Sequence, residues 1–373
     1  MYKLIIGVFF ALLLVPSVSS VMNPNFKDLV AVRLGVKTEV PYTVDQVQER
    51  IRRSNPVWTK LLPLYSGFMY RLGASPNPQS IQIGKDGWAF LGNQHLNSYD
   101  QCFGRNVMTD EQAASWSNEL TKIESYLNSK NVAFAFVVAP NSCTIYSEKL
   151  PTWASEYKAQ HQTNLEKLLE KKNSSLLDLR TNLILHKDKG SVYSKLNSHW
   201  TDYGAYVAWQ DLAAKLQHDR PSFKPFGLAD ASGVQEYDGH NEYLGMVNIR
   251  AHNNWAKPIL KTPYPITEKQ AASGEWTKMA AGELTGLLDL PRTTQTLESP
   301  NDMTALVLRD SMGDGLSSYI QASFKRVIQT QHHANNGLSK VDLMRLTETN
   351  KPDVVIFILT ERYLAFPLKT DLP

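Results

Sequence analysis

An α/β architecture is predicted, a three-layer α/β/α sandwich in which helices cover both faces of a mainly parallel sheet. Apolar runs of strand length recur at Val132–Ala139, Thr304–Leu308 and Asp353–Leu359, with no alternation of polar residues. Such runs are typical of strands that are buried on both faces. Segments of about 12 to 20 residues with helical character separate the runs, which favours crossover connections and a parallel sheet.

The composition bounds the class of protein. The chain has 373 residues, of which 42% are hydrophobic and 20% charged, as in a folded protein and unlike a disordered one. The formal net charge is only +3, and the densest group of cations is Arg50, Arg52 and Arg53. Because a solvated helix face accounts for three such residues, we expect no nucleic-acid partner.

Residues 1–20 have the pattern of a signal peptide. Lys3 provides a positive charge, Leu4–Val15 form an apolar run of 12 residues, and Pro16–Ser20 end the segment with mostly small residues. A run of this length is short of the roughly 18–20 residues that span a bilayer as a helix. We therefore expect cleavage near the end of this segment and a soluble periplasmic protein; retention as an uncleaved inner-membrane anchor is the alternative.

A lead region and one main domain are expected to follow the signal peptide. Residues 21–80 are irregular, with several prolines and two helix-like segments at 44–53 and 57–72. The main domain, residues 81–373, opens at 81–91 with two short strands around a Lys-Asp-Gly turn, which is a strong hairpin signal.

Helix and strand patterns then alternate through the main domain. Helices are expected at 109–130, at 157–172 and after the His199 motif, and further strands at 175–179 and 325–330. Thr109 and Gln112 form a capping box at the start of the first of these helices. Residues 219–300 are rich in Pro and Gly, so we expect a loop-rich insertion over one edge of the sheet.

The chain contains two cysteines, Cys102 and Cys143. In an oxidising compartment they can form a disulfide that closes a loop of about 40 residues and contributes roughly 3–4 kcal/mol. Two buried free thiols are the alternative. No Cys-x-x-Cys pattern suggests zinc, and the adjacent rings of His332 and His333 point apart, so neither a metal nor a cofactor is expected.

Two motifs place a serine and a histidine where a catalytic pair can form. A nucleophilic serine needs a base within hydrogen-bond reach, and the base needs a third group at its other nitrogen. Ser311 follows an apolar strand and opens a helix, whose free N–H groups suit an oxyanion. His199 stands in Asn-Ser-His-Trp, so Asn197 is the natural third group. Asn141 ends another strand, at the edge where functional groups gather in such sheets.

These residues also have ordinary structural interpretations. Serine caps helices well, so Ser311 can serve only to start its helix. A lone histidine such as His199 is more often structural or solvated than catalytic. The G-x-S-x-G pattern is not met either, because Arg309 stands where its first glycine would be.

Five motifs in order resemble those of the alginate O-acetyltransferase family of the AlgJ/AlgX type, exported proteins with an SGNH-hydrolase-like domain. The motifs are Gly84–Leu91, Val137–Asn141 with Tyr146 and Leu150-Pro151, His199-Trp200 with Gly204-Ala205, Asp310-Ser311, and Thr360–Leu364. The histidine precedes the serine, which is the permuted order relative to ordinary SGNH hydrolases. The chain ends soon after the last motif, so it resembles the shorter AlgJ-type members that lack a carbohydrate-binding module.

The resemblance implies transfer of acetyl groups to hydroxyls of an exopolysaccharide, alginate or a similar polymer. It makes Ser311 the nucleophile and His199 the base, and it places Asn197 at the position of the family's catalytic Asp. The substrate-binding residues would be Arg362, Tyr363 and Asn141. The implied partners are the polysaccharide and a membrane-bound acyltransferase that supplies the acetyl donor.

Two positions depart from the family pattern. Asn197 replaces the usual Asp, and Arg309 replaces the usual Gly. An Asn side chain can accept a hydrogen bond from His199 but lacks negative charge, and in a serine protease this change costs about 10⁴ in rate. Asp202 or another carboxylate could supply the charge. The alternatives to a transferase are an acetyl esterase and a catalytically impaired member that binds polysaccharide or an acetylation complex.

Overall fold

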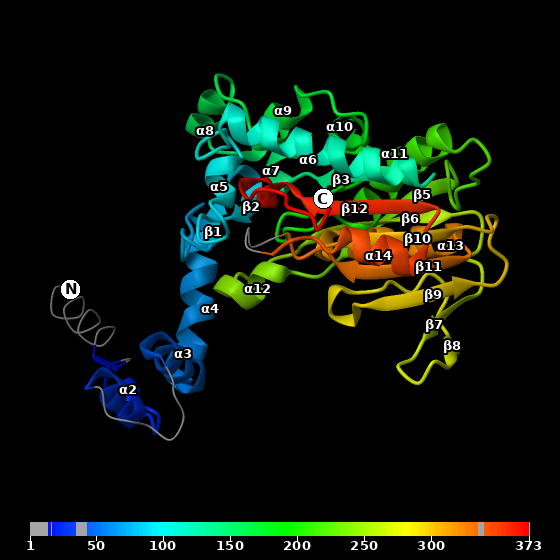
Figure 1. Cartoon of the computed structure of the whole chain (residues 1–373). Helices are drawn as coiled ribbons and strands as arrows, with labels where there is room; N and C mark the ends of the chain where they lie inside the picture. Colours follow the sequence, from blue (N-terminus) through cyan, green and yellow to red (C-terminus); the bar gives the residue numbers. More distant parts are fainter. Residues whose placement is uncertain (1–13, 16, 35–42, 335–338, 373) are drawn as a thin grey trace. The chain divides into compact units, whose positions relative to one another are not determined.

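The computed structural model describes residues 14–15, 17–34, 43–334 and 339–372 (Figure 1). By its internal contacts the chain divides into two compact units. The smaller unit comprises Met1–Pro76 with Leu244–Ala251, and the larger comprises Asn77–Tyr243 with His252–Pro373. No helix in the described ranges combines the length and the apolar character that crossing a membrane requires. Most of the expected signal peptide lies outside the described residues.

The smaller unit contains the helices α2 (Phe26–Arg33), α3 (Val44–Ser54) and α4 (Pro56–Arg71). The helices predicted at 44–53 and 57–72 are confirmed. Thr43 caps α3 with a capping box in which Gln46 is the partner, so two backbone N–H groups at the helix start are satisfied locally.

The larger unit is built on an eight-stranded sheet. In sheet order its strands are β4 (Leu176–Asp178), β3 (Ala133–Ala139), β12 (Val354–Thr360), β10 (Thr304–Arg309), β11 (Arg326–Gln331), β9 (Arg292–Thr296), β7 (Thr267–Gln270) and β8 (Trp276–Lys278). The first five strands run parallel. The last three join antiparallel at one edge. The predicted mainly parallel sheet is thus confirmed.

Helices cover both faces of this sheet, which confirms the three-layer sandwich. On one face lie α6 (Asp110–Ser129), α9 (Asn164–Leu169) and α14 (Leu343–Asn350); on the other lie α10 (Arg180–His186), α11 (Asp202–Asp219) and α13 (Asp314–Ser323). Strand β3 contributes to a hydrophobic core on each face of the sheet. Phe136 and Val138 pack in the core on the α6 side, while Ala135 and Val137 pack in the core on the α11 side. Because both faces of the strand are buried, its sequence shows no polar alternation.

The insertion at 219–300 is more ordered than its sequence suggests. It supplies the edge strands β7, β8 and β9 (Figure 1), a separate antiparallel pair β5 (Ala231–Asp238) and β6 (Asn254–Leu260), and the helix α12 (Glu242–Val247). The expectation of a loop-rich segment is corrected in this respect. These strands are half exposed and largely polar, as in the Arg-Thr-Thr-Gln-Thr of β9, so no apolar run marks them.

The helix predicted at 157–172 is wrong. The structure has two shorter helices, α8 (Thr152–Lys158) and α9, separated by a turn. Thr163 accepts a hydrogen bond from the backbone N–H of Glu166, and the Glu166 side chain accepts one from Thr163 N–H. This capping box starts a new helix at Asn164 and ends any continuous one.

A hairpin and a disulfide lie near the start of the larger unit. The predicted hairpin is confirmed as β1 (Ile81–Ile83) paired with β2 (Ala89–Leu91), and its turn η1 (Lys85–Gly87) contains Asp86 at φ 56°. A disulfide joins Cys102, at the end of α5 (Ser98–Gln101), to Cys143 in α7 (Ser142–Ile145).

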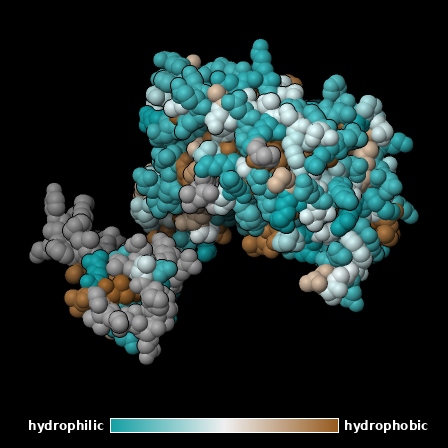
Figure 2. All heavy atoms as spheres, viewed as in Figure 1, coloured by the Kyte–Doolittle hydropathy of each residue, from teal (hydrophilic) through white to brown (hydrophobic). Residues whose placement is uncertain are grey.

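The visible face of the larger unit is mostly hydrophilic (Figure 2).

Candidate active site

Ser311 lies at the carboxyl end of β10, where the strand turns into a helix. It opens the 3₁₀ turn η4 (Ser311–Gly313), which leads directly into α13. The turn is held by Asp310, whose carboxylate accepts a hydrogen bond from Met312 N–H at 2.9 Å. The Ser311 side chain is therefore presented from a short, locally capped turn at the carboxyl end of a central strand.

His199 stands just before α11. Thr201 caps this helix by accepting a hydrogen bond from Gly204 N–H at 3.0 Å. Gly204 is required there because a Cβ atom would lie 2.0 Å from the carbonyl oxygen of Val192. The close approach fixes the start of α11, and with it the backbone that carries His199.

The structure brings Ser311, His199 and Asn197 together. His199 Nε2 lies 2.9 Å from Ser311 Oγ, and His199 Nδ1 lies 3.1 Å from Asn197 Oδ1. Asn197 Oδ1 also accepts a hydrogen bond from His199 N–H at 2.9 Å, while its Nδ2 donates to the His240 carbonyl at 3.1 Å. The amide of Asn197 is thus fully oriented: its oxygen faces His199 and its nitrogen faces His240.

A carboxylate that the sequence did not single out completes this group. Glu242, the first residue of α12, places Oε2 3.6 Å from His199 Nδ1. The same oxygen accepts hydrogen bonds from Ser198 N–H and Ser198 Oγ, both at 2.7 Å. Burial alone would raise the pKa of Glu242, but the contact with His199 and the hydrogen bonds from Ser198 outweigh it and hold this pKa at about 2.

These neighbours set the tautomer of His199. Nδ1 faces only hydrogen-bond acceptors, namely Asn197 Oδ1, Glu242 Oε2 and the oxygen of the Ser198 hydroxyl at 3.4 Å. The proton of a neutral imidazole therefore sits on Nδ1, and Nε2 is left to accept the hydroxyl proton of Ser311. This is the tautomer that a general base for a serine requires.

Asp202, the other carboxylate considered for this role, has a different partner. It is the first residue of α11, and its Oδ2 accepts a hydrogen bond from the phenol O–H of Tyr237 at 3.2 Å. It makes no ion pair with His199 within the described ranges. The charge beside His199 comes from Glu242, 44 residues beyond Ser198 in the chain.

Arg309 is part of the core and not of the reacting group. Its side chain is fully buried and forms an ion pair with Asp314. It also donates to Gln329 Oε1 at 2.8 Å and to the Thr285 carbonyl at 2.6 Å. A Cβ atom on Gly313 would lie 2.3 Å from Arg309 Cδ, so the glycine leaves room for the arginine stem.

Asp310, the residue before Ser311, is buried, and both oxygens of its carboxylate accept hydrogen bonds. Its Oδ2 accepts hydrogen bonds from Thr360 N–H at 2.7 Å and Thr360 Oγ1 at 2.8 Å, and lies 3.5 Å from His332 Nε2. Burial would raise the pKa of Asp310, but His332 and the Thr360 N–H hold it at about 2. Asp310 therefore ties β10 to β12 directly below the serine.

The three residues expected to bind substrate differ in their surroundings. Arg362 makes no ion pair in the described part of the chain; its guanidinium lies 5.0 Å from the Tyr363 ring centre, and its charge helps to lower the pKa of Asp310. Tyr363 packs against the core beside His332. Asn141 follows β3, two strands from β10, and its N–H donates to the buried Glu361 at 2.7 Å. Neither Asn141 nor Tyr363 contacts Ser311 or His199 by any hydrogen bond in the described ranges.

The paired histidines have separate surroundings among the described residues. His332 Nδ1 accepts a hydrogen bond from Ala334 N–H at 2.9 Å, and its ring stacks on Phe357. Among the described residues no group of three or more His, Cys, Asp or Glu side chains could hold a metal ion.

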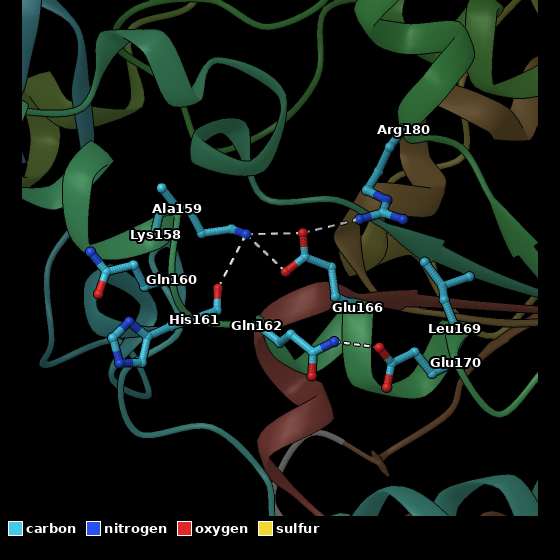
Figure 3. Close-up of a pocket in the computed structure, with 9 residues that line it drawn as sticks. All are labelled: Lys158, Ala159, Gln160, His161, Gln162, Glu166, Leu169, Glu170 and Arg180. Atoms are coloured by element: carbon cyan, nitrogen blue, oxygen red, sulfur yellow. Dashed lines mark hydrogen bonds and ion pairs between the residues drawn. The ribbon is translucent and has the colours of Figure 1, made fainter.

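A separate surface hollow lies over α8 and α9 (Figure 3). Its lining residues are Lys158, Ala159, Gln160, His161, Gln162, Glu166, Leu169, Glu170 and Arg180. Lys158 Nζ contacts both carboxylate oxygens of Glu166, at 2.9 and 3.0 Å, and Arg180 lies 3.6 Å from the same group. Because its charges are paired with one another, we assign no ligand to this hollow.

Comparisons with known proteins identify the domain type. Residues 81–258 match the family model of the SGNH hydrolase-like domain of the acetyltransferase AlgX. The match confirms the resemblance to the AlgJ/AlgX-type family and the SGNH-hydrolase-like fold of this domain. A comparison with curated protein sequences finds no significant match.

Solved structures share this fold at low sequence identity. PatB1 from Bacillus cereus is 16% identical with a TM-score of 0.55, and the match covers 76% of this chain and 96% of that chain. The same protein with a sulfonyl adduct gives 16% identity, a TM-score of 0.53 and coverages of 76% and 97%. A DHHW family protein from Eubacterium siraeum is 13% identical with a TM-score of 0.52, covering 79% and 94%. At such identities the likeness shows the fold alone.

Proposed function

We propose that this protein is an exported O-acetyltransferase that moves acetyl groups to hydroxyls of an exopolysaccharide through Ser311 and His199. The observation that carries the proposal is the 2.9 Å contact between His199 Nε2 and Ser311 Oγ, together with the acceptors around Nδ1 that leave Nε2 unprotonated. The match to an acetyltransferase domain supports acyl transfer as the reaction class.

The first half-reaction forms an acetyl-enzyme. Ser311 Oγ attacks the carbonyl carbon of the acetyl donor while its proton passes to His199 Nε2. The tetrahedral intermediate places negative charge on the carbonyl oxygen. The N–H of Ser311, the first residue of its turn, is a candidate donor to this oxygen, because the N–H groups of Met312 and Gly313 already bind Asp310. Collapse returns the proton to the leaving group and leaves Ser311 acetylated.

The second half-reaction releases the acetyl group to the acceptor. A sugar hydroxyl gives its proton to His199 Nε2 and attacks the acetyl carbon, and Ser311 leaves with that proton. With water as acceptor the same steps release acetate, so an esterase would use the same residues. The His199 side chain is 30% exposed, which allows water to compete with a sugar hydroxyl.

The substrate, donor and location belong to the same proposal. Alginate or a similar exopolysaccharide would bind with help from Arg362, whose guanidinium makes no ion pair with the described residues, and from Tyr363 and Asn141. A membrane-bound acyltransferase would deliver the acetyl group. Both partners fit a protein that is exported to the periplasm by a signal peptide at residues 1–20.

The test uses a chromogenic acetyl ester with the purified protein, with and without an alginate oligosaccharide. We expect the Ser311→Ala variant to lose about 10³-fold or more of the acetyl release, because the nucleophile is gone. Mass spectrometry of quenched wild type should find an acetyl group on the peptide that contains Ser311. The matched control is Ser129→Ala, since Ser129 is exposed on α6 and bonds only to its own helix. Equal rates in wild type and Ser311→Ala would overturn the proposal, and the ratio of acetylated sugar to free acetate separates transferase from esterase.

A further inference from the structure

We propose that Glu242 is the charged partner of His199 in this protein, and that Asn197 acts only to orient the imidazole. The proposal deepens the proposed function and rests on it for the role of Ser311. In a serine–histidine site one carboxylate normally both orients the imidazole and stabilises its charged form. Here the contacts divide these two tasks between two residues.

The first step is the position of the carboxylate. Glu242 Oε2 lies 3.6 Å from His199 Nδ1, the nitrogen remote from Ser311, and so it opposes the charge that His199 acquires when it takes the serine proton. Ser198 strengthens the link. Its hydroxyl donates to Glu242 at 2.7 Å, and its oxygen stands 3.4 Å from His199 Nδ1. The carboxylate thus reaches the ring both directly and through one hydroxyl.

The second step is how firmly Glu242 is held. Both hydrogen bonds from Ser198 meet the same oxygen that faces His199. They fix this oxygen by the backbone of the residue next to the histidine, so the two groups cannot move apart independently. The low pKa of Glu242, about 2, keeps it ionised through the neutral range in which His199 acts as a base.

The third step concerns Asn197. Its Nδ2 donates to the His240 carbonyl at 3.1 Å, a bond that an aspartate could not make. An aspartate at this position would face the carbonyl oxygen and would also add a second negative charge beside Glu242. Asn at 197 is therefore matched to a carboxylate at 242, and the departure from the family pattern is compensated within the site.

Other charged or titratable groups surround Glu242 and His199, and these groups are unchanged in all the variants below. The charge of Glu242 acts on His95, on the segment before α5, and on the Tyr243 phenol next to it. The charge of His199 acts on Asp314 at the start of α13. The charge of Arg362, in the 3₁₀ turn η6 (Glu361–Ala365) after β12, acts on His95 and Tyr243.

The test compares Glu242→Gln with a matched control, Glu236→Gln. Glu236 also accepts hydrogen bonds from the N–H and the hydroxyl of one serine, Ser191, at 3.2 and 3.1 Å, but it forms no ion pair with a histidine in the described ranges. The first readout is the rate at which a sulfonyl fluoride modifies Ser311, a single-turnover reaction in which Ser311 Oγ bonds to sulfur, fluoride leaves and His199 takes the proton. We expect modification in Glu242→Gln to be slower by about 10-fold to 100-fold. This loss is smaller than the loss of about 10⁴ in rate when the aspartate of a serine-protease triad becomes asparagine. Glu236→Gln should react at the wild-type rate.

The second readout does not require turnover. The Nδ1–H signal of His199, assigned by its loss in His199→Gln, is recorded by NMR at one pH for each variant. A carboxylate 3.6 Å from Nδ1 deshields this proton, so its signal should move upfield in Glu242→Gln. Glu236→Gln should leave the signal in place, and Ser198→Ala should give a smaller upfield move even if Glu242→Gln folds poorly.

Asn197→Asp provides the opposing test. We expect it to react more slowly than wild type, because the donor to His240 is lost and two carboxylates then crowd Nδ1. A rate gain in Asn197→Asp, or rates within twofold and an unmoved Nδ1–H signal in Glu242→Gln, would overturn the assignment. If wild type and Ser311→Ala are equally inert to the reagent and the ester, the proposed function fails, while the NMR signal still decides whether Glu242 faces His199 Nδ1.

Discussion

Arg309 shows how one residue can depart from a motif without belonging to the chemistry. The position before Asp310 is a glycine in the related motif, where a small residue suits a tight turn at a nucleophile. Here the arginine side chain runs away from Ser311 into the core, where Asp314, Gln329 and Thr285 accept its hydrogen bonds. The glycine that the turn needs is Gly313, whose missing Cβ admits the arginine stem. The departure is therefore a structural substitution.

Removal of the Arg309 side chain should act mainly on the free energy of unfolding and much less on the reactivity of Ser311. Arg309→Ala leaves the Asp314 carboxylate and the Thr285 carbonyl without their buried donor and opens a cavity, so we expect the free energy of unfolding to fall by about 3 kcal/mol. Urea unfolding measures it. The control Arg326→Ala changes an exposed arginine at the start of the neighbouring strand β11 and should cost well under 1 kcal/mol. Similar losses in both variants would contradict the structural role.

Single residues were predictable where a local motif carried them. Ser311 follows an apolar strand, so its position followed from the rule that functional groups gather at strand ends. His199 stands before a capped helix, and its pairing with Ser311 was implied by the family resemblance. Glu242 could not be found this way. It is the first residue of α12 in the insertion, with no motif around it, and only the tertiary fold brings it to Ser198 and His199.

At the scale of elements, the disulfide joins two short and largely buried helices, α5 and α7. α5 and α7 have only four residues each, and such helices are not stable by themselves. Cys102 at the end of α5 and Cys143 within α7 join them, and α7 directly follows Asn141. The bond thus anchors the strand end that carries one of the expected substrate-binding residues.

Loss of this bond should destabilise the protein by an amount that its loop length sets. The cysteines are separated by 41 positions, and closing a loop of this size contributes about 3–4 kcal/mol by restricting the unfolded chain. We expect the Cys102→Ser, Cys143→Ser double variant to lose about this much in urea unfolding. Reduction of the wild type by dithiothreitol should cause a similar loss and should leave the double variant unchanged. A loss below 1 kcal/mol in both experiments would contradict this account.

The elements that sequence patterns missed are those whose burial is partial. The central strands β3, β10 and β12 are buried on both faces, and their apolar runs identify them. The edge strands β7, β8 and β9 are half exposed and polar, so their pairing to β11 depends on the sheet being already present. The break between α8 and α9 was marked by the Thr163–Glu166 capping box, a signal that the helical spacing of 157–172 obscured.

For the whole molecule, the fold class was predictable because it depends on many apolar positions at once. The pKa values of the buried carboxyl groups were not, because they depend on where a few side chains lie in the folded protein. Asp310 and Glu242 are stabilised in their ionised forms and have pKa values of about 2. Asp211 in α11 is the opposite case: burial raises its pKa to about 6, and the hydrogen bond from Asn182 offsets this only in part. Asp178 and Glu166 have lowered pKa values, while burial raises those of Glu361 and Asp314.

These opposite shifts predict a free energy of unfolding with a maximum near pH 4–5. Unfolding stability rises with pH wherever the unfolded chain binds more protons than the folded one. From pH 2 to about 4.5 the unfolded chain protonates Asp310 and Glu242, whose ordinary pKa values are 3.8 and 4.5, while the folded protein leaves them ionised, so stability rises with pH. From about pH 4 to 6 the folded protein keeps a proton on Asp211 that the unfolded chain has lost, so stability falls with pH.

Two variants separate the two slopes in urea unfolding measured from pH 2.5 to 7. Asp211→Asn keeps an oxygen to accept the hydrogen bond from Asn182 but cannot ionise, so its decline above pH 4 should be smaller than that of wild type. Asp310→Asn should be less stable than wild type at pH 7, by about 2 kcal/mol, and should lose less on acidification, because the shift of that carboxyl is removed. Glu156→Gln changes an exposed carboxylate on α8 and should give a curve parallel to wild type. A curve for Asp211→Asn that stays parallel to wild type above pH 4 would show that this buried carboxyl does not govern the decline.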